Sequence, residues 1–179
     1  DNEASRRAWI FTSATLGGDP GLGWFVAQQG LEGARVLQLP SPFDYAQQAA
    51  VYVPATFPKP ADPEHSGRVA VLVAQSALIL GGRTLVLTTS LRAMRHIGKA
   101  VRQLLPQGAS LEVLVQGDLS KNELLARFES QHRPDGMGAV LVATGAFWEG
   151  VDLPGAVLQQ VVIDKIPFAP PDDPWVEAS

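Results

Sequence analysis

The chain has 179 residues, of which 46% are hydrophobic and 18% charged, and its formal net charge is −4. This length and composition are typical of a soluble α/β domain with a well-filled core. No apolar run is long enough to span a membrane, and the negative charge argues against a globally basic nucleic-acid binder, although it leaves a local basic groove open. The chain contains no cysteine, which excludes disulfides, thiolate metal sites and cysteine nucleophiles within these residues.

The chain opens with DNEASRRAW and no initiator methionine, so we expect a processed product or a piece of a longer protein. Apolar runs rich in Val, Leu and Ile predict strands at 9–12, 35–39, 50–54, 84–89, 111–116, 139–144 and 158–164. Continuous apolar runs with helical patterns between them indicate a parallel sheet covered on both faces. The run 9–12 stands apart from the later β-α-β units, as a strand of a different sheet would.

Three helices are predicted between these strands. Residues 66–80 are almost wholly apolar and are followed by two glycines, so this helix is expected to be buried on most sides and to end in a left-handed cap. Residues 90–105 place their apolar side chains on one face. A further helix begins at Ser120, where Glu123 completes the spacing of a capping box. The proline-rich stretch 54–67 is expected to form an extended surface loop.

Unusual loops follow four of the predicted strands: TSATLGG, TTSLRAM, QGDLS and TGAFWEGVDLPG. Ligands of an open parallel sheet bind outside the carboxyl ends of its strands. The loops offer hydroxyls, a carboxamide and glycine amides, with helix N-termini behind them, and these groups suit a phosphate backbone. Each loop alone is a weak signal, because Ser and Thr also cap helices for stability.

Basic residues follow the TTS loop at near-helical spacing, at Arg92, Arg95, Lys99 and Arg102. A charge run of this kind is typical of a solvated helix face. Arg92 is the exception that we expect to reach a ligand, because it lies in the first turn beside the loop edge.

The last of the four loops carries the most chemistry. Thr144 ends its strand and can donate to a phosphate, and Gly150 permits a close backbone approach. Asp152 can accept hydrogen bonds from a ribose or hold a basic partner. Phe147 is expected in the core, whereas Trp148 suits either the core or stacking on a base.

Several catalytic parts are missing from the sequence. It contains no GxxxxGK[ST] phosphate loop and no strand that ends in a DEAH-like acidic cluster, so it lacks the groups that bind the β- and γ-phosphates and magnesium, and no metal site is expected. A small-molecule transferase finds little support, because no nucleophile or general-base constellation is present. His65, His96 and His132 are scattered and are expected on the surface.

Five motifs, TSATL (12–16), SPFDY (41–45), LVLTTSLRAM (85–94), ATGAFWEGVDLPG (143–155) and VVIDKIPFAPPDDP (161–174), occur in this order. Together they resemble the DinG-type branch of superfamily 2 helicases, which is related to the XPD helicases. The resemblance implies a RecA-like three-layer α/β/α sandwich with a mainly parallel sheet. It assigns 1–40 to the end of the first RecA-like domain, with its motif III strand and connection. It assigns 41–179 to the second RecA-like domain, truncated before motif VI.

The same resemblance implies roles for individual residues. Motif III and motif V supply coupling residues at Ser13, Thr15 and Glu149, and the nucleotide is faced by Gly150 and Asp152. DNA is expected to be contacted by Thr89, Ser90, Arg92, Gln116, Gly117, Thr144 and Trp148.

For the whole protein the resemblance implies an ATP-dependent DNA helicase of the bacterial cytoplasm and nucleoid. It would unwind DNA 5′ to 3′ in repair or recombination. Its partners would be single-stranded DNA and the first RecA-like domain of the same chain, and no membrane. ATP and Mg²⁺ would bind together with that first domain, and an iron–sulfur cluster is possible elsewhere in the parent.

The QxxGRxxR pattern of motif VI is absent from the sequence, so this segment is expected to be inactive alone. The alternative is a stand-alone, non-catalytic RecA-like module that binds nucleic acid or protein.

Overall fold

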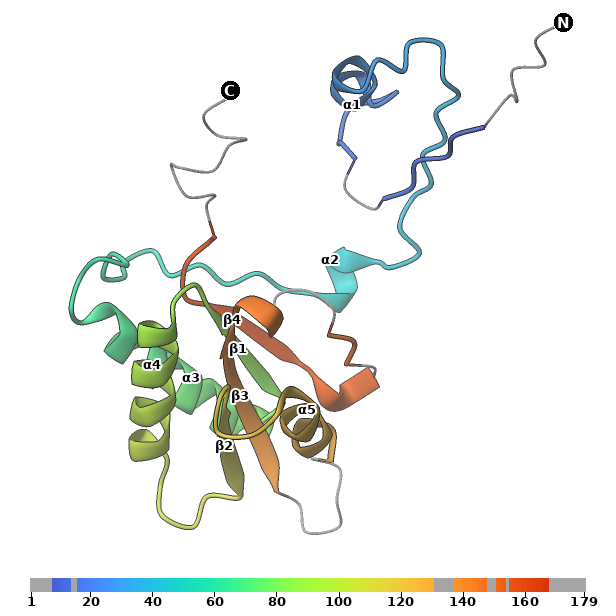
Figure 1. Ribbon diagram of the computed structural model, residues 1–179. Helices are drawn as coiled ribbons and strands as arrows, with labels where there is room; N and C mark the ends of the chain where they lie inside the picture. Colours follow the sequence, from blue (N-terminus) through green and yellow to red (C-terminus); the bar gives the residue numbers. More distant parts are fainter. Residues whose placement is uncertain (1–7, 14–15, 131–136, 148–150, 154, 168–179) are drawn as a thin grey trace, which may run out of the picture. The chain divides into compact units, whose positions relative to one another are not determined.

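The computed structural model describes residues 8–13, 16–130, 137–147, 151–153 and 155–167. The chain divides into two compact units, Asp1–Val53 and Pro54–Ser179, which are described separately. The first unit contains two short helices, α1 (Gly23–Gln28) and α2 (Tyr45–Gln48), and its described residues form no strand (Figure 1).

The three strands predicted at 9–12, 35–39 and 50–54 are therefore wrong for this structure. A strand is stable when its backbone N–H and C=O groups pair with a neighbouring strand, and the described residues of the first unit form no such ladder. The apolar side chains of these runs are left in solvent, as Ile10, Leu37 and Val51 show with exposed fractions of 85%, 80% and 92%.

The second unit is built on a four-stranded parallel sheet with the strand order β2-β3-β1-β4. Its strands are β1 (Thr84–Thr88), β2 (Leu111–Val115), β3 (Gly138–Thr144) and β4 (Gln160–Ile163). All four lie within or next to predicted apolar runs, so these strand predictions are confirmed. Two 3₁₀ turns, η2 (Gly145–Phe147) and η3 (Gly155–Val157), lie between β3 and β4.

Three helices cover the sheet: α3 (His65–Leu80), α4 (Leu91–Leu104) and α5 (Lys121–Glu129). The chain crosses from β1 to the edge strand β2 through α4 and then returns to β3 through α5 (Figure 1). Crossovers between parallel strands are right-handed. The two crossovers run in opposite directions along the sheet, so α4 and α5 lie on its opposite faces. The result is the RecA-like three-layer α/β/α arrangement that the family resemblance implies.

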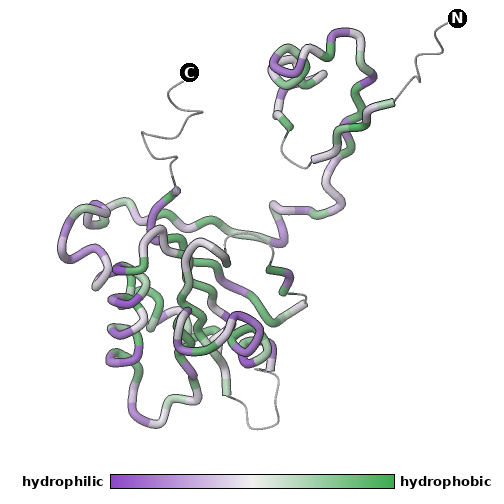
Figure 2. The backbone as a smooth tube through the Cα atoms, viewed as in Figure 1, coloured by the Kyte–Doolittle hydropathy of each residue, from purple (hydrophilic) through white to green (hydrophobic). Residues whose placement is uncertain are grey.

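The continuous apolar runs arise because both faces of the sheet are buried. One face packs Val86, Val140 and Val142 against α3 and α4, and the other packs Leu85 and Leu141 against α5. Figure 2 shows the apolar residues concentrated along the strands and polar residues on the outer turns of the helices.

Local signals set the helix ends as predicted. The Ser90 hydroxyl accepts the Ala93 N–H at 3.2 Å and caps α4. At α5, Ser120 Oγ accepts the Glu123 N–H while the Glu123 carboxylate accepts the Ser120 N–H, which confirms the capping box. Gly81 adopts the left-handed conformation that ends α3.

The expectation that the helix over 66–80 is buried on most sides is only partly confirmed. Val69, Val73 and Ala77 are buried against α4 and the sheet, but Ile79 is 86% exposed. A helix on the outer layer of a sandwich can bury only the stripe that faces the sheet and its neighbour. Among the described residues, no helix is long and apolar enough to cross a membrane.

Candidate nucleic-acid and nucleotide site at the carboxyl edge of the sheet

The parallel register brings the loops after the strands to one edge of the sheet. Thr88 of β1 lies directly opposite Thr144 of β3, and Val115 of β2 lies opposite Val142 of β3. The residues that follow these strand ends, among them the predicted Thr89 and Gln116, therefore share this edge.

Gln116 and Thr144, both predicted to face DNA, are joined directly. Gln116 Oε1 accepts the Thr144 backbone N–H at 2.8 Å, and the Gln116 backbone N–H donates to the Val142 carbonyl oxygen at 3.0 Å. Because the carboxamide oxygen is occupied, its NH₂ group is the part left to donate, and among the described residues it has no hydrogen-bond acceptor. Gly117 follows with a φ of +100°, a conformation that favours glycine.

One buried threonine, for which no role was predicted, holds the TTS loop in place. Thr88 is fully buried, and its Oγ1 lies 3.2 Å from the Ser90 carbonyl oxygen and 3.3 Å from the Ala143 carbonyl oxygen. The Thr88 hydroxyl thus connects the ends of β1 and β3 to the loop that joins β1 to α4. The Ser90 hydroxyl is engaged as the cap of α4, whereas Arg92 in the first turn is exposed.

Asp164, for which no role was predicted either, lies beside the same loop. It follows β4, and its backbone N–H donates to the Leu87 carbonyl oxygen at 3.1 Å. Burial raises the pKa of the Asp164 carboxyl above its usual value, although the backbone N–H groups of Lys165 and Thr89 and the charges of His65 and Lys165 oppose this effect. Asp164 Oδ1 and Thr89 Oγ1 are both buried without a hydrogen-bond partner among the described residues. The only sequence signal was a single acidic residue at the end of an apolar run.

His65 holds Asp164 in place, and its expected surface position is wrong. Its side chain is buried, with Nδ1 2.8 Å from the Pro58 carbonyl oxygen and Nε2 3.0 Å from the Asp164 carbonyl oxygen. The imidazole thereby links the proline-rich loop, the start of α3 and the end of β4. His96 is exposed as expected, and His132 lies outside the described residues.

The long loop after β3 is described in part. Phe147 is buried in the core beside α5, as expected. Val151 and Leu153 also pack on that core, while Asp152 between them is exposed. Its carboxylate is therefore presented away from the core, where it can accept hydrogen bonds.

Four predicted site residues lie outside the described residues, namely Thr15, Trp148, Glu149 and Gly150. Ser13 is exposed and belongs to the first unit.

The basic residues of α4 divide into two kinds. Arg102 is paired: its guanidinium contacts the Asp118 carboxylate at 2.5 Å and donates to the Val113 carbonyl oxygen at 2.8 Å. Arg95 and Lys99 are exposed and make no ion pair with a described residue, which fits the expected solvated face. Arg92, which is expected to reach a ligand, is also exposed and makes no ion pair with a described residue.

No group of three or more His, Asp or Glu side chains among the described residues could hold a metal ion. The Asp152 carboxylate is exposed and can accept hydrogen bonds.

Comparison with known proteins identifies the family of the chain. The family model of the helicase C-terminal domain matches residues 73–179. The ATP-dependent DNA helicase YoaA of Escherichia coli is 41% identical over 171 residues, which is 96% of this chain and 26% of that protein. YoaA of Haemophilus influenzae is 37% identical over 98% of this chain and 26% of its own length, and the ATP-dependent helicase DinG of Mycobacterium tuberculosis is 36% identical over 97% and 26%. The chain thus spans about a quarter of the length of these relatives, and it belongs to the helicase C-terminal domain family.

Proposed function

We propose that this chain is the second motor domain of an ATP-dependent DNA helicase and that its carboxyl edge contacts single-stranded DNA. The observation that carries the proposal is the hydrogen bond between Gln116 and Thr144 at this edge of the sheet. The chain that contains them belongs to the helicase C-terminal domain family. Whole relatives with a matching segment are named ATP-dependent DNA helicase YoaA and ATP-dependent helicase DinG.

The DNA side of the proposed site uses Thr89, Ser90, Arg92, Gln116, Gly117, Thr144 and Trp148. The Gln116 carboxamide NH₂ and the exposed Arg92 guanidinium are donors suited to phosphate oxygens. Ser90 acts through its position as the cap of α4, since its hydroxyl already accepts the Ala93 N–H. Contacts of this kind hold a strand without reading its bases, as a translocating motor requires.

The nucleotide side of the proposed site uses Gly150 and Asp152, with Ser13, Thr15 and Glu149 as coupling residues. The exposed Asp152 carboxylate is suited to accept a hydrogen bond from the ribose. ATP and Mg²⁺ are proposed to bind together with the first RecA-like domain. ATP supplies the free energy for closing and reopening the cleft between the domains.

Residues 1–40 are proposed to complete the first RecA-like domain, and 41–179 to form the second. The segment alone is then expected to be inactive. The parent is proposed to move 5′ to 3′ in DNA repair or recombination, in the bacterial cytoplasm and nucleoid, and an iron–sulfur cluster is proposed for the parent outside this segment.

The first test is ATP hydrolysis by the full-length protein with and without single-stranded DNA, beside this segment alone. The proposal expects DNA-stimulated turnover in the full-length protein and none in the segment. Unwinding of duplexes with either a 5′ or a 3′ tail then tests the direction. No turnover under any DNA condition would overturn the motor proposal.

Two variants separate the two sides of the site. Thr144→Ala should reduce DNA-stimulated turnover while ATP binding stays near normal, and Thr144→Ser is the matched control that keeps the hydroxyl. Asp152→Ala should reduce ATP turnover more than DNA binding. An equal loss of both activities with the fold intact would contradict the nucleotide-side role of Asp152.

A further inference from the structure

The His65 ring lies between two backbone carbonyl groups. Nδ1 is 2.8 Å from the Pro58 carbonyl oxygen, and Nε2 is 3.0 Å from the Asp164 carbonyl oxygen. Both distances are typical of N–H···O hydrogen bonds. A carbonyl oxygen accepts hydrogen bonds and cannot donate one, so each ring nitrogen can bond its partner only through a proton of its own.

The two contacts together require a ring that is protonated on both nitrogens. A neutral imidazole has a proton on one nitrogen and a lone pair on the other, whereas the imidazolium cation donates from both. In either neutral form, one lone pair would therefore face a carbonyl oxygen at hydrogen-bond distance. The side chain is only 5% exposed, and Phe57 packs perpendicular to the ring with 5.5 Å between the two ring centroids. A buried polar contact left unmade in this way costs free energy.

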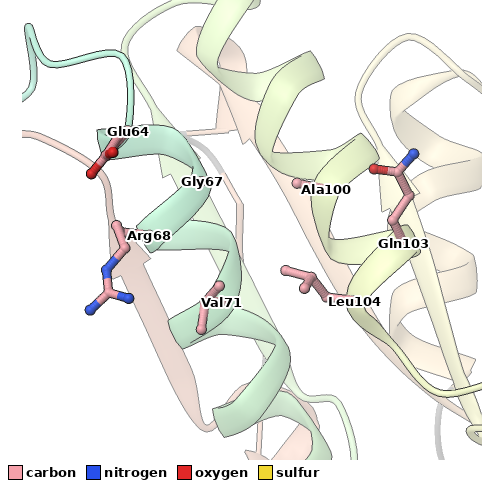
Figure 3. Close-up of a pocket in the computed structure, with 7 residues that line it drawn as sticks. All are labelled: Glu64, Gly67, Arg68, Val71, Ala100, Gln103 and Leu104. Carbon is pink, nitrogen blue, oxygen red and sulfur yellow. The ribbon is translucent and has the colours of Figure 1, made fainter.

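The charged groups around the ring include one acidic partner. Burial raises the pKa of the Asp164 carboxyl and the charge of His65 opposes that shift, so the ionised carboxylate in turn favours the protonated ring. The exposed Lys165 opposes the protonated ring. The loop before α3 and α3 itself carry further charged side chains, all of them exposed, at Lys59, Asp62, Glu64 and Arg68. Glu64 and Arg68 line an open groove between α3 and α4 (Figure 3), where solvent screens their charges.

The ring is connected through Asp164 to the DNA side of the proposed site. The Asp164 backbone N–H donates to the Leu87 carbonyl oxygen at 3.1 Å, which joins the end of β4 to β1. The Thr89 backbone N–H in turn acts on the Asp164 carboxyl group. Thr89 follows β1 in the TTS loop. The position of this loop therefore depends on Asp164, which His65 ties to Pro58 in the proline-rich loop.

We propose that His65 is a positioning residue, and that it holds the TTS loop in place for DNA only while both ring nitrogens carry a proton. The protonated ring bonds Pro58 on one side and the end of β4 on the other. Loss of one proton breaks one of these two contacts, so the end of β4 and the carboxylate beside Thr89 are held less firmly. The effect on DNA rests on the proposed motor function, whereas the protonation of the ring does not.

NMR of the full-length protein, labelled with ¹³C at histidine Cε1, measures the protonation. The signals of His65 and of the exposed His96 are assigned by their loss in His65→Gln and His96→Gln. We expect His65 to keep both protons at a pH at which His96 is mostly neutral. Asp164→Asn removes the neighbouring negative charge, so His65 should become neutral at a lower pH than in the wild type. A His65 signal that titrates together with His96, or that is neutral throughout, overturns the proposal.

DNA-stimulated ATP hydrolysis of the full-length protein over the same pH range tests the effect on the TTS loop. Gln and Asn at position 65 each donate one hydrogen bond without a charge, near the positions of Nε2 and Nδ1 respectively. While the wild-type ring is protonated, each variant should need at least about threefold more single-stranded DNA for half-maximal stimulation than the wild type. At a pH at which the ring is neutral, this difference should disappear. The control His96→Gln should equal the wild type throughout.

The outcomes separate this proposal from the motor function. A difference between His65→Gln and the wild type that is the same at every pH would indicate a structural role without proton dependence, and would overturn the proposal. Equal DNA requirements at every pH would overturn it as well, because the TTS loop would then not depend on His65. If the wild type shows no DNA stimulation at all, the motor function itself is wrong, and the NMR titration still decides whether the ring is protonated as proposed.

Discussion

The two units of the chain contain apolar runs of the same kind, yet only one turns them into a sheet. In the second unit, LVL of β1 and VLVA of β3 are fully enclosed. In the first unit, WIF and VLQL form no strand, and most of their side chains are in solvent. The composition of the runs is similar, so composition does not explain the difference.

Partners explain the difference between the units. Each central strand of the second unit has a neighbour on both sides and a helix layer on both faces, so its backbone groups and side chains are both satisfied. A short apolar run without a neighbouring strand gains neither kind of interaction. A run of this type therefore predicts a strand only together with the elements that would enclose it.

The largest expected effect comes from shortening one leucine to alanine in each unit. Leu141 is completely buried in β3, so Leu141→Ala should lower the free energy of unfolding by about 2–5 kcal/mol through lost burial and a cavity. Leu37 is 80% exposed, so Leu37→Ala should change it by less than about 0.5 kcal/mol. Urea unfolding followed by circular dichroism measures both. Equal losses would mean that the first unit has a core of its own.

Much of the second unit could be predicted because its signals are local or periodic. The hydroxyl of Ser120 and the glycines after α3 mark helix ends within a few residues, and the strands of the sheet are unbroken apolar runs. The parallel arrangement then follows from the alternation of strands and helices. These features depend on neighbours in sequence.

The contacts that shape the candidate site could not be predicted in the same way. Gln116 meets Thr144 across 28 positions, and His65 meets Asp164 across 99. A single polar residue does not reveal which distant carbonyl or amide it will reach. The carboxyl-edge positions of Gln116 and Thr144 could be predicted because Gln116 follows a strand and Thr144 ends one. The buried position of His65 could not, because nothing nearby in sequence marks its two carbonyl partners.

A second comparison uses two glycines with the same φ of +85°, Gly82 and Gly33. A Cβ on Gly82 would lie 2.4 Å from the Ala139 backbone nitrogen, whereas one on Gly33 would meet no atom within 4 Å. Gly82→Ala should therefore cost about 2–4 kcal/mol, from backbone strain and a clash with β3. Gly33→Ala should cost about 1–2 kcal/mol from strain alone, and only within the first unit. Thermal unfolding of both variants checks the difference, and a Gly82 variant as stable as wild type would contradict the close approach of the turn after α3 to the start of β3.

Helix caps give a smaller effect of the same kind. Ser120→Ala removes the hydroxyl that accepts the Glu123 N–H, and should destabilise the sheet unit by about 1 kcal/mol. Asp19 is the corresponding acceptor in the first unit, where its carboxylate accepts the Gly23 N–H at 2.6 Å. Asp19→Ala should leave the unfolding of the sheet unit unchanged. Hydrogen exchange of α5 and of the strands distinguishes the two outcomes, and a loss of protection in the strands of the Asp19 variant would show that the units are coupled.

The smallest effect is a pH dependence confined to the sheet unit. Burial holds the pKa of Asp164 above its usual value, so the folded protein retains this proton over a range in which the unfolded chain has released it. The contribution of Asp164 to stability is therefore greatest below its usual pKa and falls as the pH rises through the raised value. Asp164→Asn removes this titration, so the stability of the variant relative to wild type should increase over that window.

Glu123, in the same unit, is a control whose contribution to stability should change with pH in the opposite direction. Hydrogen bonds from the Ser120 hydroxyl and backbone N–H hold the pKa of Glu123 below its usual value, so its contribution is present above that usual value and lost as the pH falls. As the pH rises, the stability of Glu123→Gln relative to wild type should therefore decrease, whereas that of Asp164→Asn should increase. Urea unfolding of the three proteins at a series of pH values compares the slopes. Parallel curves for Asp164→Asn and wild type would mean that solvent reaches the Asp164 carboxylate, and the unpartnered oxygen at the carboxyl edge would then be a hydrated one.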